Sequence, residues 1–85
     1  MIVLTLYSRP GCHLCDDMKA IAQRVALASA TPVRIDEIDI SMDPDLEALY
    51  GLEIPVLLID GKKAAKYRTS EKDVARMIAA RRAKG

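Results

Sequence analysis

The chain has 85 residues and a formal net charge of +1 at pH 7, and 51% of its residues are hydrophobic. This length supports one domain with a modest core, and the apolar content excludes a disordered chain. No apolar run reaches the length of a membrane span, and the first residues lack the charged, apolar and small-residue order of a secretory signal. We therefore expect one domain over residues 1–85, located in the cytoplasm and not bound to a membrane.

Charged residues are segregated along the chain. Residues 1–35 carry four bases and two acids, residues 36–60 carry eight acids and no base, and residues 61–85 carry nine bases and two acids. Packing of the acidic segment against the basic one, with ordinary solvation of the rest, accounts for this pattern. A basic face for an anionic partner is the alternative. Nucleic acid is not expected as that partner, because the basic segment has one tyrosine and no known binding motif.

The first half of the chain predicts a strand, a helix and a second strand. The apolar, β-branched run at 2–7 is typical of a buried strand, and Pro10-Gly11 then predicts a turn. A second strand is expected at 33–40, after Thr31-Pro32. Between these strands, apolar residues spaced four and three apart predict a helix from Cys12 to about Ala28, with an apolar face made of Leu14, Met18, Ile21, Val25 and Ala28.

The second half begins with a short helix over 44–50. Asp43-Pro44 is typical of an N-cap followed by a proline at the first helical position, and Gly51 suits the C-terminal cap. A third strand is predicted at 54–60. Asp60-Gly61 at its end is a strong signal for a tight hairpin turn.

The hairpin returns as an antiparallel fourth strand at 62–67, and a last helix follows. Ser70 and Asp73 resemble a capping box before that helix, whose apolar face comprises Val74, Met77 and Ile78. The resulting order is β-α-β-α-β-β-α. It predicts an α/β fold in which a parallel strand pair, extended by the hairpin into a four-stranded mixed sheet, is flanked by three helices.

Cys12 and Cys15 form a Cys-x-x-Cys pair at the start of the first predicted helix. Unpaired backbone N–H groups at a helix N-terminus stabilise a thiolate, so Cys12 is the expected nucleophile. Cys15 lies nearly one turn later, closer to the packed face, and is the expected resolving thiol. A structural pair and a metal clip are the alternatives. Structural zinc needs four ligands, however, and His13 is the only other Cys or His in the chain.

Two segments, "LTLYSRPGCHLC" and "YGLEIPVLLIDGK", resemble the glutaredoxin family within the thioredoxin-like superfamily. The resemblance covers essentially the whole chain and is greatest to a bacterial glutaredoxin-like group that carries a Cys-His-Leu-Cys active site. It implies a thioredoxin-like fold and thiol–disulfide exchange in cell redox homeostasis. It also implies that Pro55 is cis and lies opposite the cysteines, that the Ile54 backbone pairs with a substrate peptide or glutathione, and that Arg9 contacts glutathione.

His13 and Leu14 replace the proline and tyrosine that glutaredoxins usually carry between the cysteines. A charged His13 would stabilise the Cys12 thiolate, so we expect it to modulate the site. The alternative is a solvated residue at the start of a helix. Pro55 likewise has a simpler interpretation, as a proline that begins a strand.

The stretch after the hairpin departs from the glutaredoxin pattern. Ala65-Lys66 stands near the usual glycine pair, and Arg68 or Thr69 stands near the aspartate that holds the amino group of glutathione. Lysine and arginine cannot accept a hydrogen bond from an ammonium group. The sequence therefore predicts glutathione as a weak co-substrate.

These observations together predict a small monomeric thiol–disulfide oxidoreductase without a bound cofactor or metal. Its substrate would be a protein disulfide or a low-molecular-weight thiol. One alternative is a redoxin that is reduced by thioredoxin reductase and serves a dedicated reductase. Another is a non-enzymatic scaffold in which the Cys12 thiolates of two chains hold an iron–sulfur cluster.

Overall fold

A four-stranded mixed sheet forms the centre of the fold, with strand order β2-β1-β3-β4. The structure is a computed structural model that describes residues 1–84. β1 pairs in parallel with β2, and β3 pairs antiparallel with β4, as the sequence predicted. β1 also pairs antiparallel with β3, which joins the hairpin to the parallel pair. The elements in chain order are β1 (Ile2–Ser8), α1 (His13–Ala28), β2 (Val33–Asp39), a 3₁₀ turn (Ile40–Met42), α2 (Pro44–Tyr50), β3 (Val56–Ile59), β4 (Lys62–Lys66) and α3 (Glu71–Lys84).

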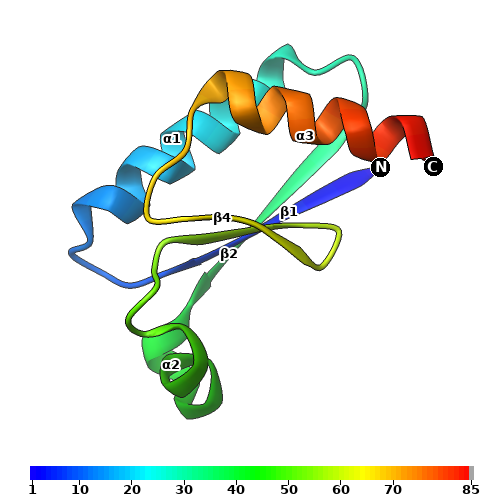
Figure 1. The fold of residues 1–85 in the computed structure, drawn as a ribbon. Helices are drawn as coiled ribbons and strands as arrows, with labels where there is room; N and C mark the ends of the chain where they lie inside the picture. The colour runs from blue at the N-terminus through cyan, green and yellow to red at the C-terminus, as the bar shows by residue number, and fades with distance from the viewer. Residues whose placement is uncertain (85) are drawn as a thin grey trace.

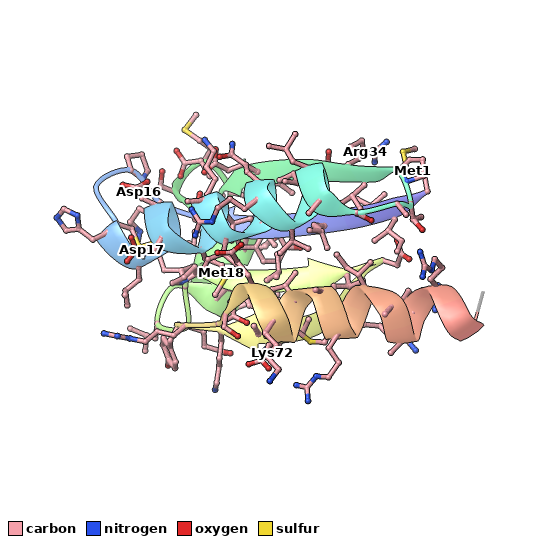
Figure 2. The ribbon with its side chains drawn as sticks, turned by 90° about the horizontal axis from the view of Figure 1, so that it is seen from above. Met1, Asp16, Asp17, Met18, Arg34 and Lys72 are labelled. Atoms are coloured by element: carbon pink, nitrogen blue, oxygen red, sulfur yellow. A yellow bond between two sulfur atoms is a disulfide. The ribbon has the colours of Figure 1, made fainter. Side chains whose placement is uncertain are left out.

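The helices cover the two faces of the sheet unequally. α1 and α3 lie side by side on one face, and α2 lies on the other (Figures 1 and 2). None of the helices within residues 1–84 has the length and apolar character needed to cross a bilayer. The order and the three flanking helices are the predicted ones, so the α/β, thioredoxin-like fold class is confirmed.

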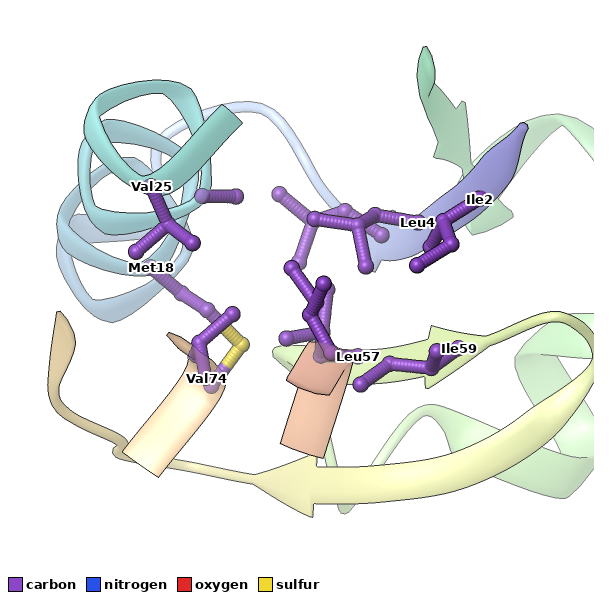
Figure 3. Close-up of a cluster of buried hydrophobic side chains, with 10 residues drawn as sticks. Ile2, Leu4, Met18, Val25, Leu57, Ile59 and Val74 are labelled. Atoms are coloured by element: carbon purple, nitrogen blue, oxygen red, sulfur yellow. The ribbon is translucent and has the colours of Figure 1, made fainter. Parts of the chain in front are cut away.

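The core lies between the sheet and the pair α1 and α3 (Figure 3). Alternate residues of β1 are buried because successive side chains of a strand point to opposite faces. Every residue of β3, which lies between β1 and β4, is buried. The cluster comprises Ile2, Leu4, Leu6, Met18, Ala22, Val25, Leu57, Ile59, Val74 and Ile78.

The apolar face of α1 differs in part from the predicted one. The helix begins at His13, with Cys12 as its N-cap. Ala28, predicted on the buried face, is exposed in the last turn of the helix. The sheet meets the face formed by Cys15, Met18, Ala22 and Val25, so Leu14 and Ile21 lie at its edge and are only partly buried.

Several strand ends lie one or two residues from their predicted positions, and two of these differences have a local cause. The third strand begins at Val56 and not at residue 54, because the Tyr50 carbonyl accepts hydrogen bonds from the N–H groups of Glu53 and Ile54 and keeps this segment folded. The second strand ends at Asp39, whose side chain accepts from the N–H of Ser41 (2.9 Å) and caps the 3₁₀ turn.

The hairpin turn connects three parts of the fold. Asp60 and Gly61 both have positive φ, which the predicted Asp-Gly turn requires. The Asp60 carboxylate accepts hydrogen bonds from the Val3 N–H of β1 (2.9 Å) and from Arg81 Nε of α3 (2.9 Å). These two bonds hold the pKa of Asp60 below its ordinary value, the Val3 bond having the larger effect. Acidic and basic segments therefore do pack together here, as the charge pattern predicted.

We predict that Leu57→Ala lowers the free energy of unfolding by about 2–5 kcal/mol, because a cavity would form at the centre of the core. Leu57 is 0% exposed in β3. Urea denaturation followed by circular dichroism measures the change. The matched control is Leu27→Ala on α1, where the side chain is 88% exposed and the expected change is within about 0.5 kcal/mol. Equal losses in the two variants would contradict the assignment of this core.

Candidate functional site

Cys12 and Cys15 form a disulfide at the N-terminus of α1, with their Cα atoms 5.2 Å apart. Cys12 is the N-cap and has extended backbone angles, and Cys15 lies within the first turn of the helix. The side chain of Cys15 is buried, with 2% exposed, whereas Cys12 is half-buried. The difference in exposure is the one that the sequence predicted.

The backbone around Cys12 is set by a turn and by the helix end. The Cys12 N–H donates to the Arg9 carbonyl (3.3 Å), and Gly11 between them has a φ of 79°, which glycine adopts without strain. The Cys15 N–H donates to Cys12 Sγ (3.1 Å). An N-cap side chain ordinarily accepts such a bond through oxygen, and here the sulfur takes that place. The same N–H group is therefore positioned to stabilise a Cys12 thiolate.

His13 is the first residue of α1 and is exposed. Asp16 and Asp17 follow in the first turns and are exposed too (Figure 2). Within the described part of the chain, the His13 side chain makes no hydrogen bond or ion pair. Its predicted effect on Cys12 stays a prediction.

The Ile54–Pro55 peptide bond is cis, as the family resemblance implied. β3 begins directly after it, and Val56 pairs with Tyr7 near the end of β1. Because the loop that carries Cys12 leaves β1 just after this point, Pro55 and Cys12 lie at the same end of the sheet. The Ile54 N–H already donates to the Tyr50 carbonyl (3.1 Å), so only the carbonyl of Ile54 is left to pair with a bound chain.

Arg9 is at the same end of the sheet, but it is engaged by an acid that the sequence did not indicate. Its guanidinium forms an ion pair with the carboxylate of Glu47 in α2. Tyr7 and Tyr50 stack nearby, with ring centroids 4.8 Å apart, so the Tyr7 ring packs against α2. No motif could have indicated Glu47, because 38 residues separate the two partners and only the fold brings them together.

A hollow of about 310 Å³ lies beside the buried Cys15. Three acids, Asp16, Glu37 and Asp39, and one cation, Arg9, are among the residues that line it. Glu37 is also bound from outside the wall by Lys19 Nζ at 3.0 Å. The complete lining is Ser8, Arg9, Pro10, Gly11, Cys15, Asp16, Glu37 and Asp39.

A second groove, of about 390 Å³, lies between α1 and the loop after β4. Arg68 and Thr69, the residues predicted in place of the glutathione-binding aspartate, line it together with Leu14 from the cysteine motif. The preceding residue, Tyr67, holds this loop against the cis-proline segment. Its N–H donates to the Pro55 carbonyl (2.9 Å), and its hydroxyl donates to the Leu52 carbonyl (3.1 Å).

An ion pair lies between the residue before Ile54 and β4. Lys63 Nζ and Glu53 Oε1 are 2.7 Å apart, and Lys66 Nζ is 3.9 Å from the same oxygen. The hydrogen bond between Lys63 and Glu53 lowers the pKa of Glu53 and raises the pKa of Lys63. Lys66 therefore already faces an acid of this chain. Within residues 1–84, no group of three His, Cys, Asp or Glu residues is placed to hold a metal ion.

A family model described as glutaredoxin-like domain (DUF836) matches residues 3–79, which include both cysteines and the cis-proline segment. The chain belongs to this glutaredoxin-like family. No curated protein sequence matches it. The family assignment agrees with the resemblance seen in the cysteine motif and the cis-proline segment.

Solved structures show the same fold as this glutaredoxin-like chain. Protein XcR50 from X. campestris is 32% identical, over 91% of this chain and 96% of that one, with a TM-score of 0.73. Protein Ne2328 from Nitrosomonas europaea is 26% identical, over 89% of each chain, with a TM-score of 0.69. A thioredoxin from Halobacterium salinarum is 21% identical, over 93% of this chain and 73% of its own, with a TM-score of 0.66, and shows likeness of fold alone.

We predict that limiting iodoacetamide at neutral pH labels Cys12 of the reduced protein well before Cys15. Cys12 is half-buried at the helix N-terminus and receives the Cys15 N–H, whereas the Cys15 side chain is almost fully buried. Peptide mass spectrometry of the alkylated protein measures the order. Faster labelling of Cys15 would reverse the two assigned roles.

Proposed function

We propose that this glutaredoxin-like chain is a thiol–disulfide oxidoreductase that uses Cys12 as nucleophile and Cys15 as resolving thiol. The observation that carries the proposal is the Cys12–Cys15 disulfide at the N-terminus of α1, with one sulfur half-buried and the other buried. Membership of the glutaredoxin-like family supports a redox role for this pair. We further propose that the chain works as a monomer in the cytoplasm, where its thiols are returned to the reduced state.

The reaction begins with the reduced protein. The Cys12 thiolate attacks one sulfur of a substrate disulfide, the other substrate sulfur leaves as a thiolate, and a mixed disulfide forms. The Cys15 thiolate then attacks Cys12 Sγ, and the second substrate sulfur leaves. The substrate gains two electrons and two protons, and the protein is left with the Cys12–Cys15 disulfide. A dithiol, or two monothiols, returns the two electrons by the reverse exchange.

The local geometry gives each cysteine one role. The N–H of Cys15 donates to Cys12 Sγ, so it stabilises this sulfur both as attacking thiolate and as leaving group when the disulfide is reduced again. Burial of Cys15 keeps its sulfur from an outside disulfide but not from Cys12, which is three residues away. A substrate chain would reach Cys12 beside the cis-Pro55 segment and pair with the Ile54 carbonyl.

We propose protein disulfides or low-molecular-weight disulfides as substrates, with glutathione as a weak co-substrate. Arg68 and Thr69 line the groove where an acceptor for the glutathione ammonium would be needed, and neither supplies a carboxylate. The only carboxylate among the residues that line this groove is that of Asp17, on α1 and not in the loop after β4. Arg9, the expected partner of a glutathione carboxylate, is already paired with Glu47. These placements favour a protein dithiol as the source of electrons, as in a redoxin that thioredoxin reductase recycles.

We predict that the protein reduces a small neutral disulfide faster with the thioredoxin reductase system than with the glutathione system. The loss of one charged pairing costs about ten- to a hundredfold in affinity for glutathione, because such a pairing contributes roughly 1.5–3 kcal/mol. Coupled assays that follow NADPH oxidation at equal protein concentration measure the two rates.

Two variants control this comparison. Cys12→Ser should abolish turnover with either reductant, whereas Cys15→Ser should accumulate a mixed disulfide that is visible by mass. Turnover by Cys12→Ser equal to that of the unsubstituted chain would refute the proposed chemistry. Glutathione-dependent turnover equal to that of an ordinary dithiol glutaredoxin would refute only the preference between reductants.

A further inference from the structure

The ion pair between Arg9 and Glu47 lies at the edge of the site. Arg9 directly follows β1 and is three residues before Cys12, and Glu47 is in α2, which buries no residue of its own. Gly51 lies against the same pair: a Cβ there would lie 2.5 Å from the Glu47 carbonyl oxygen, 2.9 Å from Glu47 Oε1 and 3.4 Å from Arg9 Nη2. Glu47 Oε2 is buried and accepts no hydrogen bond within the described residues. Among the described residues, Arg9 is therefore the only side chain that binds the Glu47 carboxylate.

The ion pair with Glu47 matters for the chemistry because Arg9 also lines the hollow beside Cys15. Arg9 is the only cation that lines the hollow beside Cys15, and the other charged groups of the wall are the carboxylates of Asp16, Glu37 and Asp39. Arg9 is paired with Glu47 and Glu37 is paired with Lys19, so the acids of this wall without an ion pair among the described residues are Asp16 and Asp39. An anionic thiol or disulfide that approaches the cysteines along this side meets repulsion without a free cation to offset it.

We propose that Glu47 is a specificity-determining positioning residue, which binds Arg9 and thereby lowers the reactivity of the cysteine pair towards carboxylate-bearing disulfides relative to neutral ones. The inference rests on the proposed thiol–disulfide exchange and assigns one cause of its discrimination against glutathione. Glu47 acts through Arg9 and does not itself touch the reacting sulfurs.

The test measures single exchange steps in a Cys15→Ser background, where the reaction stops at the mixed disulfide. Second-order rate constants are measured for Cys12 with glutathione disulfide, which carries carboxylates, and with 2-hydroxyethyl disulfide, which is uncharged. The ratio of the two constants is the readout. A change in the reactivity of the Cys12 thiolate affects both reactions and cancels in the ratio.

Glu47→Gln should raise this ratio in favour of glutathione disulfide by about two- to fivefold, the scale of one half-exposed charge interaction. Arg9→Ala breaks the same ion pair but should lower the ratio, because it leaves Glu47 as an additional unpaired acid. In the Arg9→Ala and Glu47→Gln double variant, the gain seen with Glu47→Gln should vanish. Raised ionic strength should reduce the effect, since salt screens exposed charges.

The matched control is Asp36→Asn, which removes an exposed ion pair of the same kind between Arg34 and Asp36 (3.1 Å), within β2 and away from both grooves. It should leave the ratio unchanged. If Glu47→Gln and Arg9→Ala move the ratio in the same direction, or not at all, while Cys12 still reacts with both disulfides, the role of Glu47 is refuted and the exchange chemistry stands. If Cys12 reacts with neither disulfide, the proposed function itself fails.

Discussion

The position of β1 at the centre of the sheet is the constraint on which the site depends. β1 is hydrogen-bonded to β2 on one side and to β3 on the other, and its alternate side chains are fixed in the core. Its last residues therefore place two segments at once: the loop to Cys12, which continues the strand, and the cis-Pro55 segment, which is held by the pairing of Tyr7 with Val56. Residues that are far apart in sequence meet at one end of the sheet for this reason.

The helix that follows β1, α1, places its two cysteines in different environments. A cysteine at the N-cap occupies the place where a side chain ordinarily satisfies a free backbone N–H, so its sulfur and not an oxygen receives that bond. The next cysteine is three residues later and lies under the helix, against the sheet. One short segment thus supplies an accessible sulfur and a protected one. α2 contributes no buried residue, and it influences the site through the contact of Glu47 with Arg9 and through the Tyr50 carbonyl, which accepts the N–H of Ile54.

Local signals in the sequence predicted most of the fold. The Asp-Gly turn, the Asp-Pro cap and the helical spacing of apolar residues each act over a few neighbours, and each element they predicted is present. The errors concern choices that only tertiary packing makes, such as the exposure of Ala28 in the last turn of α1. The late start of β3 is of the same kind, since the Tyr50 carbonyl accepts two N–H groups that could equally have paired in a strand.

The site was predictable to a smaller extent. The cysteine motif was evident from spacing, whereas the cis bond before Pro55 followed from family resemblance, because most X-Pro bonds are trans. The partner of Arg9 was not predictable, since no pattern in the sequence links position 9 to position 47. Charge segregation indicated only that acids and bases would meet. Which of them meet, and beside which sulfur, depends on the crossing of α2 past the end of β1.

The most direct test of the account is a redox titration of the Cys12–Cys15 pair in buffers of defined dithiol and disulfide ratio. Alkylation and mass measurement would give the reduced fraction, and circular dichroism would follow the fold. The account predicts one reversible two-electron transition, in which the ratio of reduced to oxidised protein changes tenfold for about 30 mV, with the fold retained in both states. A disulfide that is reduced only when the protein unfolds would contradict the account, because the pair would then be a structural crosslink.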